Sequence, residues 1–318
     1  MQLKSALMAS PGPKTPKEAL VLYFKGVAMG AADIIPGVSG GTIALISGIY
    51  THLIDAIKSV DLDTFKNLGR LRLADALAGV HLRFLVVLLA GIGTAIIGIA
   101  RLMHWLLKEE PVLTWSAFFG LILASILILA LKVQWSLARV GGLLGGAVFG
   151  FLVVGMIPVQ TPTDWWFIIL VGMIAICAMI LPGISGAFLM LILGKYEYVT
   201  GALKNPTSID SLVIIVLFAV GAALGIGAFS RVLSYLLHHF EAMTLAFLTG
   251  LMAGSLRKVW PWKEVLETKM IRGKEHVLRE ANILPNLDAQ LAAAVALMVA
   301  GLVLIWLLER WSRPGDGG

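Results

Sequence analysis

The chain has 318 residues, of which 58% are hydrophobic and 14% are charged, and its mean hydropathy is +0.90. A soluble globular domain carries about 25% charged residues, so the composition excludes an ordinary soluble domain and predicts an all-α protein that crosses a membrane several times. The net charge of +6 suits cytoplasmic loops and anionic lipid headgroups, and we expect no nucleic-acid partner.

The first half of the chain reads as a short tail, an interrupted apolar stretch and three spans. Residues 1–17 are polar and lack the apolar core of a signal peptide, so we expect a cytoplasmic N-terminal tail. Residues 21–57 are apolar but interrupted at Pro36-Gly37, and a polar loop follows at 58–82. Three apolar spans come next, at about 84–107, 114–131 and 140–157.

The second half repeats this order. A linker at 158–164 without basic residues leads into an apolar stretch at 165–203, which is interrupted at Pro182-Gly183. Spans are expected near 211–237, 244–256 and 289–309, with a charged segment at 257–288 between the last two. Each interrupted stretch is long for one span and short for two. We therefore expect two re-entrant hairpins, over 21–57 and 165–203, each made of two half-helices.

A seven-residue phrase marks both interruptions. It reads Ile34-Ile35-Pro36-Gly37-Val38-Ser39-Gly40 in the first half and Ile180-Leu181-Pro182-Gly183-Ile184-Ser185-Gly186 in the second. From Ile34 to Tyr50, 9 of 17 positions are identical at an offset of 146, and Arg101 matches Arg231 at an offset of 130. These matches predict an internal duplication, with repeats over 18–157 and 164–310 inside one integral membrane domain.

The orientation of the two repeats follows from the number of crossings. A re-entrant hairpin plus three spans crosses the membrane an odd number of times, so the second repeat should be inverted relative to the first. The basic N-terminus and the 58–82 loop then lie inside, and the 158–164 linker lies outside. The basic segment at 257–288 disagrees with this arrangement, because the inverted order places it outside.

The interruptions have the chemistry of an anion site. A half-helix that starts after the phrase has unpaired N–H groups and partial positive charge at its N-terminus, and glycine lets a ligand approach the backbone. Phosphate is a common occupant of such ends. The alternative is a kink where small residues permit close packing. The expected phosphate-binding residues are Ser39, Gly40, Gly41, Thr42, Ser185 and Gly186, with breaks at Pro36, Gly37, Pro182 and Gly183.

Two arginines inside spans are further candidates. Arg101 and Arg231 each lie about six residues from the C-terminal end of an apolar span, where a charge usually faces a cavity or a partner. Guanidinium groups bind phosphate in bidentate fashion, so both could receive an anionic headgroup, one near each face. The alternative is that both side chains extend to the lipid headgroup zone.

The remaining ionisable residues near the phrases offer a coupling role. Asp33 precedes the first phrase, and Glu197 follows Tyr196 at the end of the second matched segment. Either carboxylate could carry a coupling proton or cation, or could serve as a helix cap or interfacial residue. No histidine has metal-ligand spacing with acids or cysteine, so we expect neither a metal nor a cofactor. Glycine-rich runs at 141–150 and 221–227 indicate close helix packing and permit a homodimer without requiring one.

The two phrases, extended through Gly48-Ile49-Tyr50 and through Gly194-Lys195-Tyr196-Glu197, resemble the signatures of a bacterial membrane family of polyprenyl-phosphate (undecaprenyl-phosphate) translocases. The resemblance spans nearly the whole chain. It implies a multi-pass plasma-membrane protein that returns undecaprenyl phosphate from the outer to the inner leaflet for reuse in envelope synthesis. A lipid phosphate fits the residues, because it needs an anion site for its head and an apolar flank for its tail.

Two other functions remain open from the sequence. Undecaprenyl-pyrophosphate phosphatases also carry re-entrant segments with a Pro-Gly-x-Ser phrase, but their pattern places Arg directly after that Ser. Here Gly40 and Gly186 follow the serines, and hydrolysis lacks its equipment of base and charge stabilisation. We therefore expect no enzyme activity. The other alternative is a transporter of a small soluble anion.

Overall fold

The computed structural model describes residues 10–34, 39–60, 62–70, 72, 79–271 and 274–312. The helices of the first half are α2 (Pro16–Asp33), α3 (Gly40–Ile46), α4 (Tyr50–Lys58), α5 (Leu62–Gly69), α7 (Leu82–Gly98), α8 (Ala100–Glu109), α9 (Pro111–Lys132) and α10 (Leu137–Val154). Those of the second half are α11 (Trp165–Ile180), α12 (Gly186–Ile192), α13 (Tyr196–Lys204), α14 (Ile209–His239), α15 (Glu241–Val259) and α16 (Ala289–Ser312). Strands β1 (Lys263–Ile271) and β2 (Lys274–Asn282) lie between α15 and α16.

Polar caps fix where several long helices begin. Thr15 accepts a hydrogen bond from the amide of Glu18 at the start of α2, and Pro16 occupies the first helical position, where its missing N–H costs nothing. Ser136 caps α10 and Ser208 caps α14 in the same way. Each of these caps places the start of its helix just before the apolar run.

Several helices have the length and composition of membrane spans. Four qualify singly, namely α9, α10, α14 and α16, and the number rises to six if the bent pairs α3–α4 and α7–α8 each count as one span. The α7–α8 pair bends by 49° and the α3–α4 pair by 120°. Multiple membrane spans are therefore confirmed, and the span expected at 84–107 is broken at Ile99.

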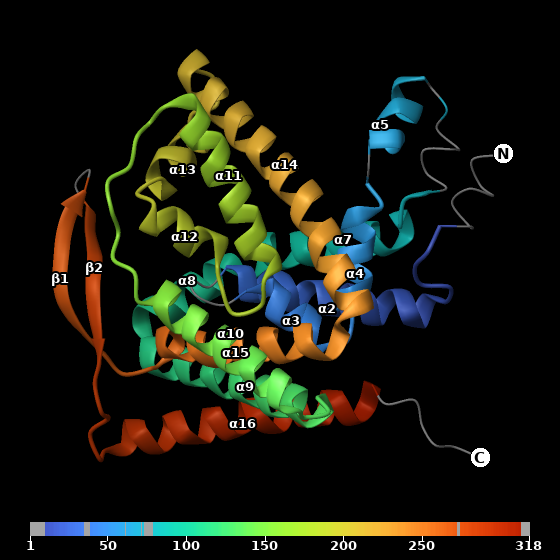
Figure 1. Ribbon diagram of the computed structural model, residues 1–318. Coiled ribbons are helices and arrows are strands. Elements are labelled where there is room, and N and C mark those ends of the chain that lie inside the picture. The colour runs from blue at the N-terminus through green and yellow to red at the C-terminus, as the bar shows by residue number, and fades with distance from the viewer. Residues whose placement is uncertain are drawn as a thin grey trace, which may run out of the picture.

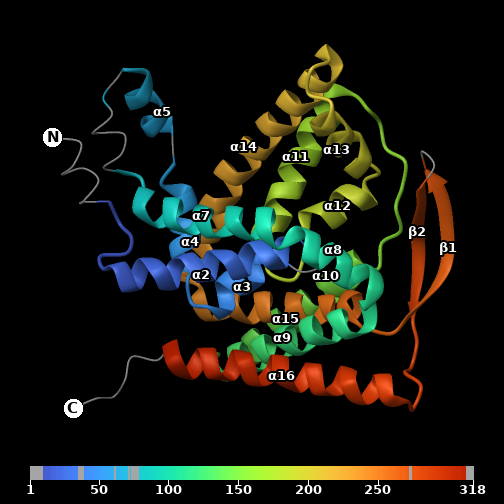
Figure 2. The same cartoon turned by 180° about the vertical axis from the view of Figure 1, so that it is seen from behind.

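The two halves interleave in space. Helix α9 of the first half packs on α16, and α10 packs on α15, whereas α2 packs on α7 and α11 on α14. Figures 1 and 2 show α9, α10, α15 and α16 as one group, with α2, α3, α4 and α7 and the group α11–α14 both lying above it. Each half thus completes the packing of the other.

Glycine makes the closest of these contacts. A Cβ atom at Gly146 of α10 would lie 2.1 Å from the carbonyl oxygen of Phe247, and one at Gly221 of α14 would lie 2.0 Å from that of Ile169. Backbone at that distance cannot give way to a methyl group. The prediction that the runs at 141–150 and 221–227 serve close helix packing is confirmed.

Each interrupted stretch contains three helices where the sequence predicted two half-helices. The break at the phrase is followed by a second turn at Gly48 between α3 and α4, and at Gly194 between α12 and α13. Their φ angles are +72° and +62°, a left-handed conformation that favours glycine at a helix C-terminus. Gly48 and Gly194 match between the two halves, so these turns could have been predicted from the sequence.

The charged segment at 257–288 forms an antiparallel β-hairpin, an element that the all-α prediction did not include. The register shifts between Val265 and Thr268, so the alternation typical of a strand is interrupted in the sequence. Figure 1 places this hairpin at one end of α9 and α16, whereas the start of α2 and the end of α16 lie at the opposite end. The segment therefore lies far from both termini of the described chain.

Candidate functional site

The two phrases lie against each other in the interior of the molecule. The hydroxyl of Ser39 lies 3.1 Å from the carbonyl oxygens of both Met179 and Leu181, and can donate to either. The amide of Gly183 donates to Oγ1 of Thr42 at 2.9 Å. Residues 182–186 are buried, as are Ser39 to Thr42. Of the expected breaks, Pro182 and Gly183 lie in this contact, and Pro36 and Gly37 lie outside the described residues.

Tyr50 strengthens the same contact. Its hydroxyl donates to the carbonyl oxygen of Ile180 at 3.2 Å, and its side chain is only 2% exposed. A Cβ atom at Gly41 would lie 2.4 Å from that same oxygen, so only glycine allows this approach. The last carbonyls of α11 have no partner within their own helix. Side chains of α3 and α4 supply the missing donors.

The first three amides of α3 have acceptors within the chain. Gly40 donates to Oδ1 of Asp33 at 2.6 Å, Gly41 donates to the hydroxyl of Ser39 at 3.1 Å, and Thr42 donates to the carbonyl of Ser39 at 2.9 Å. The carboxylate of Asp33 is a negative group at the positive end of a helix, which stabilises it there. At the first break, the carboxylate of Asp33 therefore occupies the position that an anionic ligand would take.

The start of α12 differs. Ser185 makes no side-chain cap, and within the described part of the chain the amides of Gly186, Ala187 and Phe188 make no hydrogen bond. Met179 stands at the position that Asp33 occupies in the first half, and a thioether cannot replace a carboxylate as acceptor. Buried amides without acceptors are rare in folded proteins. The second break thus keeps the donors that an anionic ligand needs.

The C-terminal ends of the two short helices are satisfied by different residues. Lys25 donates from Nζ to the carbonyl oxygen of Ser47 at 2.7 Å, after α3. After α12, the hydroxyl of Thr161 donates to the carbonyl oxygen of Leu193 at 2.5 Å, and Lys195 donates to the carbonyl oxygen of Thr161 at 2.7 Å. Lysine near a helix C-terminus is favourable. The sequence analysis missed Lys25, which has no basic counterpart in the second half.

The two arginines do not reach the breaks. Arg101 lies on α8 and Arg231 on α14, and both side chains are exposed. The guanidinium of Arg231 donates to the carbonyl of Gly227, one turn earlier in its own helix. In the described residues neither arginine bonds to a residue of either phrase. Glu197 lies in the first turn of α13, so it belongs to the second interrupted stretch but not to the break itself.

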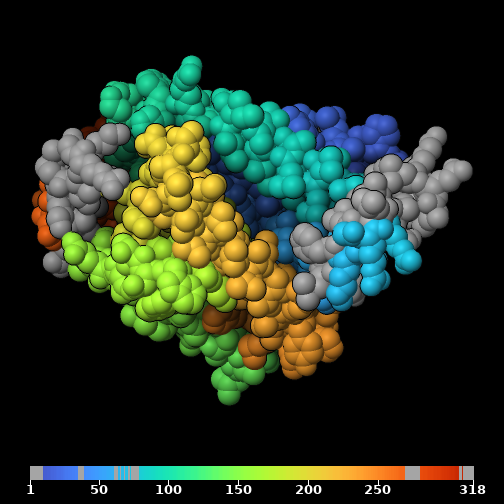
Figure 3. All heavy atoms as spheres, turned by 90° about the horizontal axis from the view of Figure 1, so that it is seen from above, coloured from blue at the N-terminus to red at the C-terminus, as the bar shows by residue number. Residues whose placement is uncertain are grey.

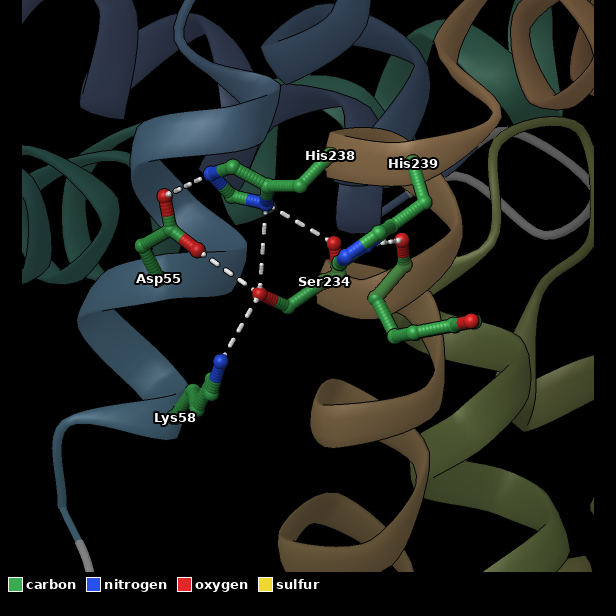
Figure 4. A network of polar contacts seen from close by, with 6 residues as sticks. Asp55, Lys58, Ser234, His238 and His239 are labelled. Atoms are coloured by element: carbon green, nitrogen blue, oxygen red, sulfur yellow. Dashed lines mark hydrogen bonds and ion pairs between the residues drawn. The ribbon is translucent and has the colours of Figure 1, made fainter.

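A polar network joins the end of the first interrupted stretch to α14 (Figure 4). Asp55 accepts from the hydroxyl of Ser234 at 3.0 Å and lies 3.5 Å from Nε2 of His238. Lys58 donates to the hydroxyl of Ser234 at 3.2 Å. The sequence analysis found no metal-ligand spacing around any histidine and did not pair His238 with an acid. Its only local signal was the four-residue spacing of Ser234 and His238 on one helix face.

The space above the first stretch is hollowed. Figure 3 shows a hollow between the teal atoms of α7 and the yellow atoms of α14, with blue atoms of the N-terminal part of the chain at its floor. Among the described residues, no group of three His, Cys, Asp or Glu side chains is placed to bind a metal ion.

Comparison with known proteins identifies the relatives of this chain. Residues 29–277 match a family model described as undecaprenyl phosphate translocase-like. The chain is 40% identical over 303 residues to a polyprenyl-phosphate transporter of Vibrio cholerae serotype O1, covering 92% of this chain and 97% of the relative. It is 30% identical over 255 residues to a polyprenyl-phosphate transporter of Staphylococcus aureus, covering 75% of this chain and 85% of that protein. No solved structure matches the chain.

Proposed function

Because the chain belongs to the undecaprenyl phosphate translocase-like family, we propose that it moves undecaprenyl phosphate from the outer to the inner leaflet of a bacterial plasma membrane. The lipid carrier then becomes available again for envelope synthesis. The family is one of transporters, which argues against the phosphatase alternative. The polyprenyl tail stays in the bilayer, and the protein has to carry only the charged head across the apolar core.

The short helices of the two halves match in length and spacing, as expected of a carrier built from two repeats. Helices α3 and α12 have seven residues each, and α4 and α13 have nine each, all at the offset of 146 that relates the phrases. We take residues 18–157 and 164–310 as inverted repeats with re-entrant interrupted stretches. The hairpin β1–β2 then faces outside, and the start of α2 and the end of α16 face the cytoplasm. Figure 1 places these two helix ends opposite the hairpin, which agrees with this orientation.

The phosphate head is proposed to bind at the second break. The observation that carries this proposal is that the amides of Gly186, Ala187 and Phe188, at the start of α12, make no hydrogen bond with the described residues. Ser185 can add a hydroxyl donor. Ser39 and Thr42 hold the second break in place through their bonds to residues 179–183, while Gly40 and Gly41 let α3 approach closely. A headgroup near the amides gains charge-assisted hydrogen bonds.

Asp33 and the arginines have roles that follow from this site. A proton taken up by Asp33 would weaken the bond to the amide of Gly40, so this carboxylate is our first candidate for coupling, with Glu197 the second. Arg101 and Arg231 are proposed to meet the headgroup near opposite faces, before and after it reaches the break. Replacing either with Gln should reduce transport and leave folding intact.

Leaflet-resolved transport in proteoliposomes tests the function. The purified chain should accelerate the movement of undecaprenyl phosphate between leaflets, and a pH gradient should change the rate if Asp33 carries the coupling proton. Undecaprenol, which lacks the phosphate, is the control and should not be accelerated. Soluble sulfate and phosphate should compete only weakly. Equal rates with and without protein, or uptake of soluble anions in place of the lipid, would overturn the proposal.

A further inference from the structure

Two lysines converge on one carboxylate beside the β-hairpin. Nζ of Lys258, at the end of α15, lies 3.3 Å from Oε2 of Glu280, and Nζ of Lys263, at the start of β1, lies 3.5 Å from the same oxygen. The three side chains are largely enclosed, with 27%, 12% and 28% of their surface exposed. Glu280 therefore ties the hairpin to the end of α15.

The charge of this cluster is not balanced. Two ammonium groups share one carboxylate, which leaves an excess positive charge in a partly buried place, and Arg257 precedes Lys258 in the chain. Burial, the largest influence on Glu280, would raise its pKa, but Lys263 and Lys258 together hold that pKa below the ordinary value. Burial lowers the pKa of Lys263. Partly buried cations with too few counter-ions favour the binding of an anion.

Aromatic rings shield both ammonium groups from water. Nζ of Lys263 lies 4.6 Å from the centroid of the Trp115 ring, and Nζ of Lys258 lies 5.1 Å from that of Phe188. Such contacts hold a cation without neutralising its charge. An anion that reaches the two lysines would therefore meet them in a poorly hydrated setting, where charge-assisted hydrogen bonds are strong.

The cluster adjoins the second break. Phe188, which lies under Lys258, is the third residue of α12, and its amide is one of the three that make no hydrogen bond with the described residues. Ser255 of the same α15 end lies beside Gly183, since a Cβ atom there would come within 2.7 Å of the Ser255 hydroxyl. The lysines and the start of α12 thus belong to one region of the molecule.

We propose that Lys258 and Lys263 bind the phosphate head of the lipid beside the second break, and that the carboxylate of Glu280 occupies this cation pair when no lipid is bound. The inference rests on the proposed function and adds to it the residues that recognise the negative charge. Glu280 then competes with the substrate, so that its removal strengthens binding. In a purely structural ion-pair cluster, by contrast, removal of Glu280 would weaken the fold and leave binding no tighter.

The sign of the E280Q effect separates the two. Binding of undecaprenyl phosphate to the purified full chain in nanodiscs would be measured for the wild type, E280Q, K258Q and K263Q, with undecaprenol as the neutral lipid. We expect E280Q to bind the phosphate lipid several-fold more tightly, and each lysine variant to bind it about tenfold more weakly. Undecaprenol binding should not change in any of them. Glu264, an exposed carboxylate on β1, supplies the matched control, and E264Q should bind like the wild type.

The outcomes are decisive for this inference. If E280Q binds like E264Q or more weakly at an unchanged unfolding temperature, Glu280 is no competitor and the proposal is wrong. If E280Q unfolds at a lower temperature than the wild type, the test is the affinity of K258Q and K263Q for the phosphate lipid. Wild-type affinity in both lysine variants would overturn the proposal. A chain that fails to transport yet shows the expected binding pattern would refute the transport function alone. A chain that transports while the lysine variants bind normally would refute this inference alone.

Discussion

The two breaks have nearly the same sequence but different chemistry. At the first, the amides of α3 are closed by Asp33 and Ser39, and Ser39, Thr42 and Tyr50 turn toward the second half. At the second, Met179 stands in place of the acid, and the first three amides of α12 have no partner in the described chain. We infer from this difference that the two phrases have different roles. One copy supports the site, and the other keeps the donors that an anion can use.

The largest expected effect comes from removing one free amide at the second break. Proline at Ala187 eliminates the N–H in the first helical turn, where proline is tolerated because that group has no partner within the helix. The loss of a charge-assisted hydrogen bond should lower the affinity for undecaprenyl phosphate about tenfold or more. The control A187V keeps the amide and adds comparable bulk. Binding assays in nanodiscs measure both, and equal affinities for the two variants would remove the amide from the site.

Opening the first break should be costly for stability. D33A leaves the amide of Gly40 without its acceptor, which should lower the free energy of unfolding by about 1–3 kcal/mol. D33N retains an acceptor oxygen at the same place and should lose less. Thermal unfolding in detergent compares the two variants. An equal loss in D33A and D33N would mean that the carboxylate charge, rather than the hydrogen bond to Gly40, stabilises the break.

The bond between the breaks has a matched pair of variants at Thr42. T42V removes the acceptor of the buried Gly183 amide at nearly constant volume, and we expect a loss of about 1–2 kcal/mol. T42S keeps the hydroxyl that accepts from Gly183, so the free energy of this hydrogen bond should stay within about 0.5 kcal/mol of the wild type. Urea-dependent unfolding would measure the difference. Indistinguishable variants would show that the two halves are joined mainly by apolar packing.

The smallest effect distinguishes the two glycine turns. Alanine at Gly48 meets no atom within 4 Å, so G48A should cost only the strain of the left-handed backbone, about 1 kcal/mol. At Gly194 a Cβ atom would lie 2.6 Å from the carbonyl oxygen of Val159, so G194A should cost more. Unfolding temperatures of the two variants test this order. The reverse order would mean that the 158–164 linker yields easily.

Much of the membrane architecture is visible in the sequence, because it depends on local patterns. The lengths of the apolar runs predicted the spans, and the glycines at 141–150 and 221–227 predicted close packing that the contacts of Gly146 and Gly221 confirm. The β-hairpin was not predicted, because a register shift near Glu267 interrupts the alternation of side chains along its strands. The turns at Gly48 and Gly194 were not predicted, because each stretch was interpreted as having a single break at its Pro-Gly pair.

The pairing of distant side chains could not be predicted in the same way. Asp55 meets His238, and Lys258 meets Glu280, across turns and helices that no local periodicity relates. Arg101 and Arg231 occupy matching positions in the two halves, but both are exposed and neither bonds to a break within the described residues, so their role in binding stays a prediction. Repeat symmetry indicates equivalent positions on the backbone. The individual side chains around them decide whether those positions keep equivalent chemistry.

The central claim is that the phosphate head binds at the second break. Photo-crosslinking tests it most directly, using full-length protein in nanodiscs and an undecaprenyl phosphate analogue with a photoreactive group beside the phosphate, with labelled peptides mapped by mass spectrometry. We predict that the label falls on residues 182–192 and on the end of α15 near Lys258, and that the neutral alcohol analogue does not label them. Label confined to the lipid-facing surfaces of α14 and α16, with the same pattern for the alcohol, would contradict the claim.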